Sequence, residues 1–215
     1  MNSLEEEYLQ NQAKGAREIY ERNKKLTKKL FNRLESVSGV GSTKELTTNF
    51  RVFLENIIKE RKIQSISDCP CGDFNWMNLV DLQAAEYWGY DVVEALIQEN
   101  RQKYPQVNFE VFNAIENVLP QRDLIIARDF LFHLSNESVL KVLANFKRSG
   151  TKYLITTSFD DVKENIDLKE DEKKRGWGWR KINVEIAPFN LGNPLAQIEE
   201  QTPNGLRLQK LYLLN

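Results

Sequence analysis

The stretch 63-IQSISDCPCGDFNWM-77 decides the fold that we expect for this chain. Residues Ile63–Ser67 are predicted to form a short strand, which ends at an acid, Asp68, and runs into a turn containing Gly72. In open α/β sheets, ligands bind just beyond the carboxyl ends of the strands, and a glycine there lets backbone amides approach a ligand closely. The sequence therefore places Asp68 and Gly72 at a candidate ligand site.

Downstream of this turn, segments typical of strands and helices alternate. The predicted strands are Tyr87–Tyr90, Val107–Phe112, Asp123–Ala127 and Tyr153–Thr157, and the predicted helices are Val93–Lys103 and Glu137–Arg148. Such alternation indicates a parallel sheet covered on both faces. In the tail, Leu195–Thr202 and Leu206–Leu214 flank Pro203-Asn204-Gly205, whose Asn-Gly pair is a strong hairpin signal. We expect the sheet to end in an antiparallel pair.

The segment before Ile63 has a helical pattern. A broken apolar stripe over Leu4–Leu34 predicts one or two long amphipathic helices, and Lys44–Arg61 predicts another after the glycine loop at 38–43. We therefore divide the chain into an N-terminal helical cap, 1–60, and an α/β domain, 61–215. The domain carries an insertion at about 160–190, whose charged stretch between Asp160 and Gly178 is expected to form a mobile flap. The whole is expected to be one compact unit.

Composition excludes several classes of function. The chain has 215 residues, with 30 Lys and Arg against 31 Asp and Glu, so it offers no broad surface for phosphate backbones, and no nucleic-acid partner is expected. The acidic start, MNSLEEEYLQ, is not a secretory signal, and no stretch approaches the roughly 20 apolar residues that span a bilayer. These features predict a cytoplasmic protein without membrane contact. Cys69, Cys71 and the single His133 are too few for a metal site.

A second acid follows the second predicted strand. Asp91, nineteen residues beyond Gly72, stands about where dinucleotide-type folds keep the acid that accepts hydrogen bonds from ribose hydroxyls. A nicotinamide dehydrogenase would use the same acid, but its fingerprint needs G-x-G-x-x-G at the first turn, where this chain has one glycine.

On these motifs, Ile63–Phe159 resembles the class I S-adenosylmethionine-dependent methyltransferases, whose first motif is an acid before a glycine-rich turn and whose second is an acid ending the next strand. Pro70 and Phe74 replace two of the usual glycines, which marks a DxPCGDFNWM-type subfamily. The resemblance implies a Rossmann-like methyltransferase fold: a mostly parallel seven-stranded sheet ending in an antiparallel hairpin, with helices on both faces. It also implies S-adenosylmethionine as the cofactor, S-adenosylhomocysteine as the product, and no metal.

The resemblance further implies that Asp68–Gly72 pass beside the methionine part of the cofactor, that Asp91 holds the ribose, and that Asn113 and Ala114 lie beside the adenine. Ser42 belongs to the glycine loop, which we expect to close over the cofactor. The residues predicted to contact the cofactor are Ser42, Asp68, Cys69, Pro70, Cys71, Gly72, Asp91, Val92, Asn113, Ala114 and Arg128.

The fourth predicted strand ends in a polar group of candidate catalytic residues. Arg128, Asp129 and His133 follow it, and Asp129 and His133 would share one face if a helical turn comes next. A carboxylate beside the imidazole would raise its pKa and orient the ring, so His133 is the predicted general base for a hydroxyl acceptor. The alternatives are a structural histidine with a backbone partner and, for Asp129, a helix N-cap.

Two groups of residues are predicted to contact the acceptor. Asp73, Asn75 and Trp76 follow the first turn, and GWGWRKINVEIAPFN supplies aromatic and cationic side chains past the fifth strand. From this second group we select Trp177, Trp179, Arg180, Phe189 and Asn190. The alternative for the aromatic members is that they fill the core under a loop.

These observations predict an S-adenosylmethionine-dependent enzyme, monomeric or homodimeric, that methylates an O or N atom of a small polar metabolite such as a sugar or sugar nucleotide. A second hypothesis is a non-catalytic or regulatory protein that binds the same cofactor on the same fold. A third is a protein or RNA methyltransferase, which would need a docking surface or a basic groove.

Overall fold

The computed structural model describes residues 3–29, 35–202 and 205–214. Within this part of the chain, seven strands form one sheet in the order β3-β2-β1-β4-β5-β7-β6. Their bounds are β1 Ser65–Asp68, β2 Glu86–Asp91, β3 Asn108–Val111, β4 Leu124–Ala127, β5 Tyr153–Ser158, β6 Ala196–Thr202 and β7 Gly205–Leu213. The central strands are short, and every residue of β4 (LIIA) and β5 (YLITTS) is buried, as expected for parallel strands covered on both faces.

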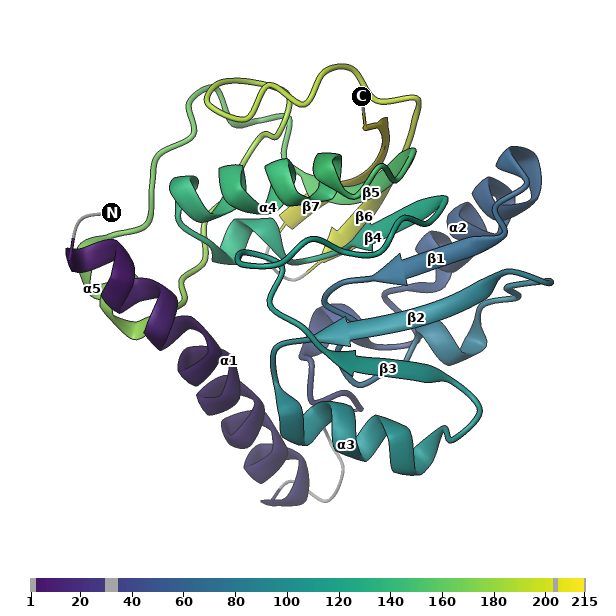
Figure 1. Ribbon diagram of the computed structural model, residues 1–215, viewed down its shortest axis with the longest axis horizontal. Helices are drawn as coiled ribbons and strands as arrows, with labels where there is room; N and C mark the ends of the chain where they lie inside the picture. Colours follow the sequence, from purple (N-terminus) through teal and green to yellow (C-terminus); the bar gives the residue numbers. More distant parts are fainter. Residues whose placement is uncertain (1–2, 30–34, 203–204, 215) are drawn as a thin grey trace.

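Strands β1 to β5 run parallel, and β7 pairs antiparallel with both β5 and β6. The expected fold is therefore confirmed, including the antiparallel hairpin at the end of the sheet. Of the predicted turn Pro203-Asn204-Gly205, the first two residues lie outside the described residues. The strand order reverses at β1, since β2 and β3 extend to one side of it and β4 and β5 to the other (Figure 1).

Helices cover both faces of the sheet. On one face, α2 (Thr48–Arg61) and α3 (Glu94–Lys103) bury Phe50, Leu54 and Ile97 in a shared apolar cluster. On the other face, α4 (Asn136–Arg148) buries Val139, Val142 and Phe146. The hydroxyl of Ser135 accepts from the Ser138 amide and so caps the start of α4.

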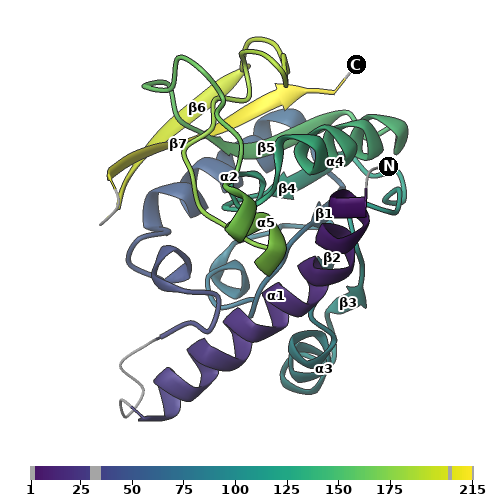
Figure 2. The same cartoon turned by 90° about the vertical axis from the view of Figure 1, so that its left-hand side faces the viewer.

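Two further helices lie over the carboxyl edge of the parallel strands. The long helix α1 (Ser3–Lys29) crosses this edge, and the short α5 (Glu170–Arg175) from the insertion lies against it (Figures 1 and 2). An added Cβ at Gly15 of α1 would lie 2.6 Å from the Arg175 carbonyl oxygen, so the glycine permits this close approach. Tyr20 of α1 packs against Val93 and Leu96 beside the end of β2.

The predicted cap at 1–60 therefore has two roles, because α1 lies over the edge of the sheet while α2 packs on its face. The predicted helix over Leu4–Leu34 is observed as α1, and its last part, 30–34, lies outside the described residues. The insertion carries α5, and Asn165 fastens it by donating to the carbonyls of Asn183 and Ala187. No helix in the described ranges has the length and apolar character of a membrane span.

Candidate functional site

The candidate site begins with Asp68 at the end of β1, where the strand order reverses. Its side chain is buried, and the Tyr87 hydroxyl donates to Oδ2 over 2.7 Å. Oδ1 is also buried and has no hydrogen-bond partner among the described residues. Burial raises the pKa of this carboxyl to about 7, although the bond from Tyr87 opposes the shift. Asp68 thus offers an unsatisfied oxygen at the edge of the sheet.

The turn after Asp68 is attached to the strands on both sides. The amide of Cys69 donates to the Ile126 carbonyl of β4, and the amide of Cys71 donates to the Tyr90 carbonyl of β2, each over 2.8 Å. Both thiols are free and buried, and burial raises their pKa, so neither is a reactive thiolate. No group of three metal-type ligands exists in the part of the chain that the structure describes.

Asp91, at the end of β2, holds the turn after Asp68 through hydrogen bonds from backbone amides. Its Oδ2 accepts from the Gly72 amide over 3.2 Å, and its Oδ1 accepts from the Val93 amide over 3.0 Å. Burial raises the pKa of Asp91 to about 6, against the opposing effect of these backbone donors. Asn100 of α3, which sequence reasoning missed, donates to the Gly72 carbonyl over 2.8 Å. The two acids predicted at the site therefore lie on neighbouring strand ends, joined by one turn.

The space that a side chain at position 72 would occupy is filled by Ser38. Gly72 has φ 56°, and an added Cβ would overlap the Ser38 hydroxyl. Ser38 belongs to residues 35–43, which we call the strap, and its hydroxyl accepts from the Asp73 amide over 2.9 Å. The glycine thus serves the left-handed turn and the approach of the strap.

Asp73 and Asn75, predicted to contact the acceptor, hold the strap. The carboxylate of Asp73 accepts from the Ser36 hydroxyl over 3.0 Å and from the Val37 amide over 2.8 Å. The Asn75 amide donates to the carbonyl of Ser42 over 3.0 Å and to the Glu35 carboxylate. The backbone carbonyl of Ser42 therefore lies close to the first turn, at the carboxyl edge of the sheet.

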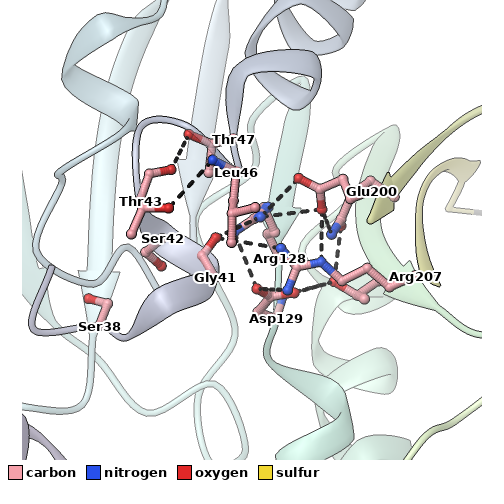
Figure 3. Close-up of polar contacts among 12 residues, drawn as sticks. Ser38, Gly41, Ser42, Thr43, Leu46, Thr47, Arg128, Asp129, Glu200 and Arg207 are labelled. Atoms are coloured by element: carbon pink, nitrogen blue, oxygen red, sulfur yellow. Dashed lines mark hydrogen bonds and ion pairs between the residues drawn. The ribbon is translucent and has the colours of Figure 1, made fainter. Parts of the chain in front are cut away.

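The other end of the strap meets an ionic cluster beyond β4 (Figure 3). Arg128 donates to the Gly41 carbonyl and to Glu200, each over 2.9 Å. Arg207 donates to Asp129 over 2.6 Å and to Glu200 over 2.9 Å. The rings of Trp76 and Phe50 lie against the Arg128 guanidinium, so Trp76, predicted for the acceptor, is a core residue beneath this cluster.

The pairing expected between Asp129 and His133 is not observed. A 3₁₀ turn, Leu131–His133, follows β4, and Asp129 precedes it with φ 54°, so the helical face that they were to share does not form. Asp129 pairs with Arg207 and Arg128, and it caps no helix. His133 has a backbone partner, since its Nδ1 lies 2.7 Å from the Gly178 carbonyl oxygen. The expected rise in the His133 pKa is also wrong, because burial lowers it.

The aromatic segment after β5 is divided among several places. Trp177 packs against Gly15 of α1, whereas Trp179 keeps 42% of its surface exposed and contacts the rings of Phe132 and Phe159. Arg180 donates to the Leu134 carbonyl and to the Asn136 side chain over 2.7 Å. Trp179 thus presents its indole next to the 3₁₀ turn that carries His133.

Phe189 and Asn190 were predicted to contact the acceptor. Their contacts among the described residues lie away from the carboxyl ends of the parallel strands. Phe189 is buried in the cluster under α4, and Asn190 is exposed, with its amide against the Pro188 carbonyl. For Phe189, the core interpretation is the one that the structure supports.

The residues expected beside the adenine follow β3. The side-chain oxygen of Asn113, the atom expected to bind the adenine, accepts a hydrogen bond from the Ile115 amide over 3.0 Å. Ala114 is buried, and its carbonyl accepts from the Asn145 side chain. Beside β2, Val92 lines a cavity of about 510 Å³ between α1 and the start of α3, together with Lys14 and Arg17 of α1. An open space therefore exists beside Val92 and Val93, the two residues that follow Asp91.

Comparison with known proteins identifies the fold. No family model matches the sequence, and no curated protein matches it. The structure is similar to the N-methyltransferase NodS from Bradyrhizobium japonicum WM9 in complex with S-adenosyl-L-homocysteine, with a TM-score of 0.60 and 11% identity over 81% of this chain and 90% of that chain. It is also similar to magnesium protoporphyrin IX methyltransferase from Synechocystis PCC 6803 with bound SAH, with a TM-score of 0.56 and 12% identity over 79% and 84%.

A third similar structure is the PH0226 protein from Pyrococcus horikoshii OT3, with a TM-score of 0.56 and 17% identity over 81% of this chain and 93% of that chain. At such low identities the likeness establishes the fold, which is the Rossmann-like methyltransferase fold. It does not carry an activity or a substrate from those proteins to this one.

Proposed function

We propose that this protein is an S-adenosylmethionine-dependent methyltransferase acting on an O or N atom of a small polar molecule. The observation that carries the proposal is the pair of buried acids, Asp68 and Asp91, at adjacent strand ends where the strand order reverses. Ligands of open α/β sheets bind at this point. Methyltransferases with S-adenosylhomocysteine bound are among the proteins of similar fold.

The residues at the edge fit this cofactor. Asp68 retains a buried oxygen with no partner among the described residues, which suits a donor such as the ammonium of a methionine moiety. The carboxylate of Asp91 accepts two backbone bonds and keeps lone pairs for ribose hydroxyls. The adenine would lie toward Val92, Asn113 and Ala114, beside the cavity under α1.

The energetic cost of burying the Asp68 carboxyl supports the same assignment. A buried carboxyl with one unsatisfied oxygen destabilises the fold, because its charged form loses hydration without full compensation. Strongly perturbed acids in such positions are typical of functional sites.

When bound, S-adenosylmethionine supplies an electrophilic methyl group and becomes the thioether S-adenosylhomocysteine. His133 would hold the proton lost by an acceptor hydroxyl. Because the Gly178 carbonyl can only accept, the hydrogen of the neutral ring lies on Nδ1, which leaves Nε2 free of a proton. Burial lowers the His133 pKa, so the ring is neutral at pH 7 and is ready to act as a base.

The acceptor site would lie between His133 and Trp179. The exposed indole of Trp179 offers an apolar face to a ring or sugar, and the 3₁₀ turn offers the imidazole. Cytoplasmic location and a monomeric or homodimeric state remain predictions from the sequence.

The test has two stages. Calorimetry with S-adenosylmethionine and S-adenosylhomocysteine should show one site per chain, and the absence of binding to either would overturn the proposal. A methyl-transfer assay should then use labelled cofactor and a metabolite extract freed of protein and RNA. Binding without transfer to any fraction favours the non-catalytic hypothesis, and transfer only when protein or RNA is restored favours the third one.

A further inference from the structure

The β6–β7 hairpin extends past the carboxyl end of β5 and reaches the strap. The pairing of β5 with β7 ends at Ser158 opposite Leu208, so Arg207 is the first residue of β7 beyond it. Glu200 of β6 lies directly opposite Arg207 in the pairing of the hairpin. Only 1% of the Glu200 side chain and 8% of the Arg207 side chain is exposed. The hairpin thus buries an ion pair next to the candidate site.

Arg207 connects three elements that are far apart in the sequence. Its Nε donates to Glu200 over 2.9 Å, its Nη1 donates to Asp129 over 2.6 Å, and its Nη2 lies 3.5 Å from the Gly41 carbonyl oxygen. The guanidinium fork suits such a role, because its donors have a fixed planar geometry. One side chain therefore links the hairpin, the end of β4 and the strap (Figure 3).

The strap approaches this cluster through a glycine. An added Cβ at Gly41 would lie 2.8 Å from Asp129 Oδ2 and 3.0 Å from Arg207 Nη1. Two cations and two carboxylates balance each other here, namely Arg128, Arg207, Asp129 and Glu200. The loss of one member would leave a partner charge buried without compensation.

We infer that Arg207 is a positioning residue, which acts through Asp129 and Gly41 to hold the strap against the Gly72 turn, and that cofactor affinity depends on this contact. The strap is anchored by the Asp73 carboxylate, by the Asn75 amide at Glu35 and Ser42, and by Arg128 and Arg207 at Gly41. The contacts at Gly41 are thus one of the points that fix its position over Gly72. Among the described residues, the hydrogen bonds of Arg207 go to Glu200, Asp129 and Gly41 and not to the Gly72 turn. The inference rests on the proposed function, since it concerns the affinity for that cofactor.

The experiment compares R207M, R207K and G41A with the parent and with R61M, a change at the exposed C-terminal end of α2. Amide hydrogen exchange over residues 36–43 reports the strap in the absence of ligand, and calorimetry gives the affinity for S-adenosylhomocysteine. We expect R207M and G41A to speed exchange in the strap and to weaken binding by roughly 3- to 30-fold. R61M should match the parent.

The conservative and double variants separate positioning from general destabilisation. R207K keeps the charge and should recover part of the affinity, although it loses the fork. The double variant R207M/G41A should bind about as well as the weaker single variant, because both changes act through one contact. If R207M does not fold, R207K and G41A supply the same comparison.

Two failures are distinguishable. A parent that binds no S-adenosylhomocysteine overturns the proposed function and, with it, the dependence of cofactor affinity on Arg207. A parent that binds it, with R207M and G41A unchanged in both affinity and strap exchange, overturns this inference alone.

Discussion

The backbone amide of Gly72 donates to the Asp91 carboxylate over 3.2 Å, and this bond joins the first turn to the end of β2. The carboxylate therefore has two tasks in the proposed enzyme, since it shapes the turn and offers its remaining lone pairs to ribose hydroxyls. Replacement of Asp91 would remove both.

The variant Asp91→Ala is expected to weaken the binding of S-adenosylhomocysteine by roughly 1–3 kcal/mol, the range for the loss of hydrogen bonds to a charged group. Calorimetry measures the change. Asp81→Ala is the matched control, because Asp81 is exposed and accepts only from the nearby Gln83 amide among the described residues. An unchanged affinity in folded Asp91→Ala would remove Asp91 from the site.

The variant Asp68→Asn should change stability in a pH-dependent way. The folded pKa of about 7 is above the unfolded value of about 3.9, so the folded state binds the proton more tightly. The parent's stability advantage from this proton is complete below pH 4 and is lost as the pH rises to about 7. The side-chain amide of the variant does not titrate, and its oxygen can still accept from the Tyr87 hydroxyl.

We therefore expect Asp68→Asn to be close to the parent in unfolding free energy near pH 4 and to exceed it by about 4 kcal/mol at pH 8. Urea unfolding at both pH values measures this difference. The same variant should bind S-adenosylhomocysteine more weakly, because a carboxylate oxygen is replaced. A stability difference that does not vary with pH would contradict the burial of a titrating carboxyl.

The variant His133→Asn should separate catalysis from structure. The Asn amide can still donate to the Gly178 carbonyl, which is the described backbone contact of the ring. With a hydroxyl acceptor, we expect a loss of turnover of roughly 10²- to 10⁴-fold, typical of a missing general base, while the affinity for S-adenosylhomocysteine stays near that of the parent. Parental turnover would leave His133 with a structural role.

The pH profile of the parent gives an independent test of His133. Because the base must be neutral and burial lowers its pKa, activity should be level at pH 7 and should fall only below the ordinary histidine value of about 6.5. The measurement is kcat/KM for an identified hydroxyl acceptor against pH at saturating S-adenosylmethionine, so that Asp68 and Asp91, which titrate near 7 and 6 in the cofactor-free protein, do not shape the profile. A profile that rises with a midpoint above 7 would point to another base.

The variant Gly15→Ala tests how α1 is held over the edge. Alanine normally stabilises a helix relative to glycine by about 1 kcal/mol. Here the added methyl would meet the Arg175 carbonyl oxygen and the Trp177 ring, so we expect α1 to detach more readily. Faster amide exchange in α1 measures this effect, with the exposed Lys14→Ala as control. Equal exchange in both variants would show that the contact is loose.

Much of the fold followed from local patterns, because the strands are short segments that alternate with helical segments, and the ends of β1 and β2 carry acids. Asp68 and Asp91 were correctly placed at the ends of adjacent strands, and Gly72 in the turn after the first of them, since the fold brings consecutive strands together. The Asn-Gly pair predicted the hairpin. Strands β6 and β7 pair from Ala196 opposite Leu211 to Thr202 opposite Gly205.

The side-chain partners beyond these strand ends were not predictable in the same way. Arg207 and Glu200 come from the end of the chain, and their partners in the strap and after β4 lie at least 72 residues away in the sequence. The chain was expected to continue from Asp129 into a helical turn. Asp129 itself has a positive φ, and its side chain pairs with Arg207. Such contacts depend on the assembled sheet, and no local pattern announces them.

The placement of β7 between β5 and β6 has a consequence for synthesis on the ribosome. Residues 205–213 are translated after every other strand of the sheet, yet β5 has no partner on that side until they arrive. A nascent chain that lacks them exposes the unpaired edge of Tyr153–Ser158, a template for association with other chains. Until β7 has formed, the edge of β5 would therefore need to be shielded, for example by a chaperone.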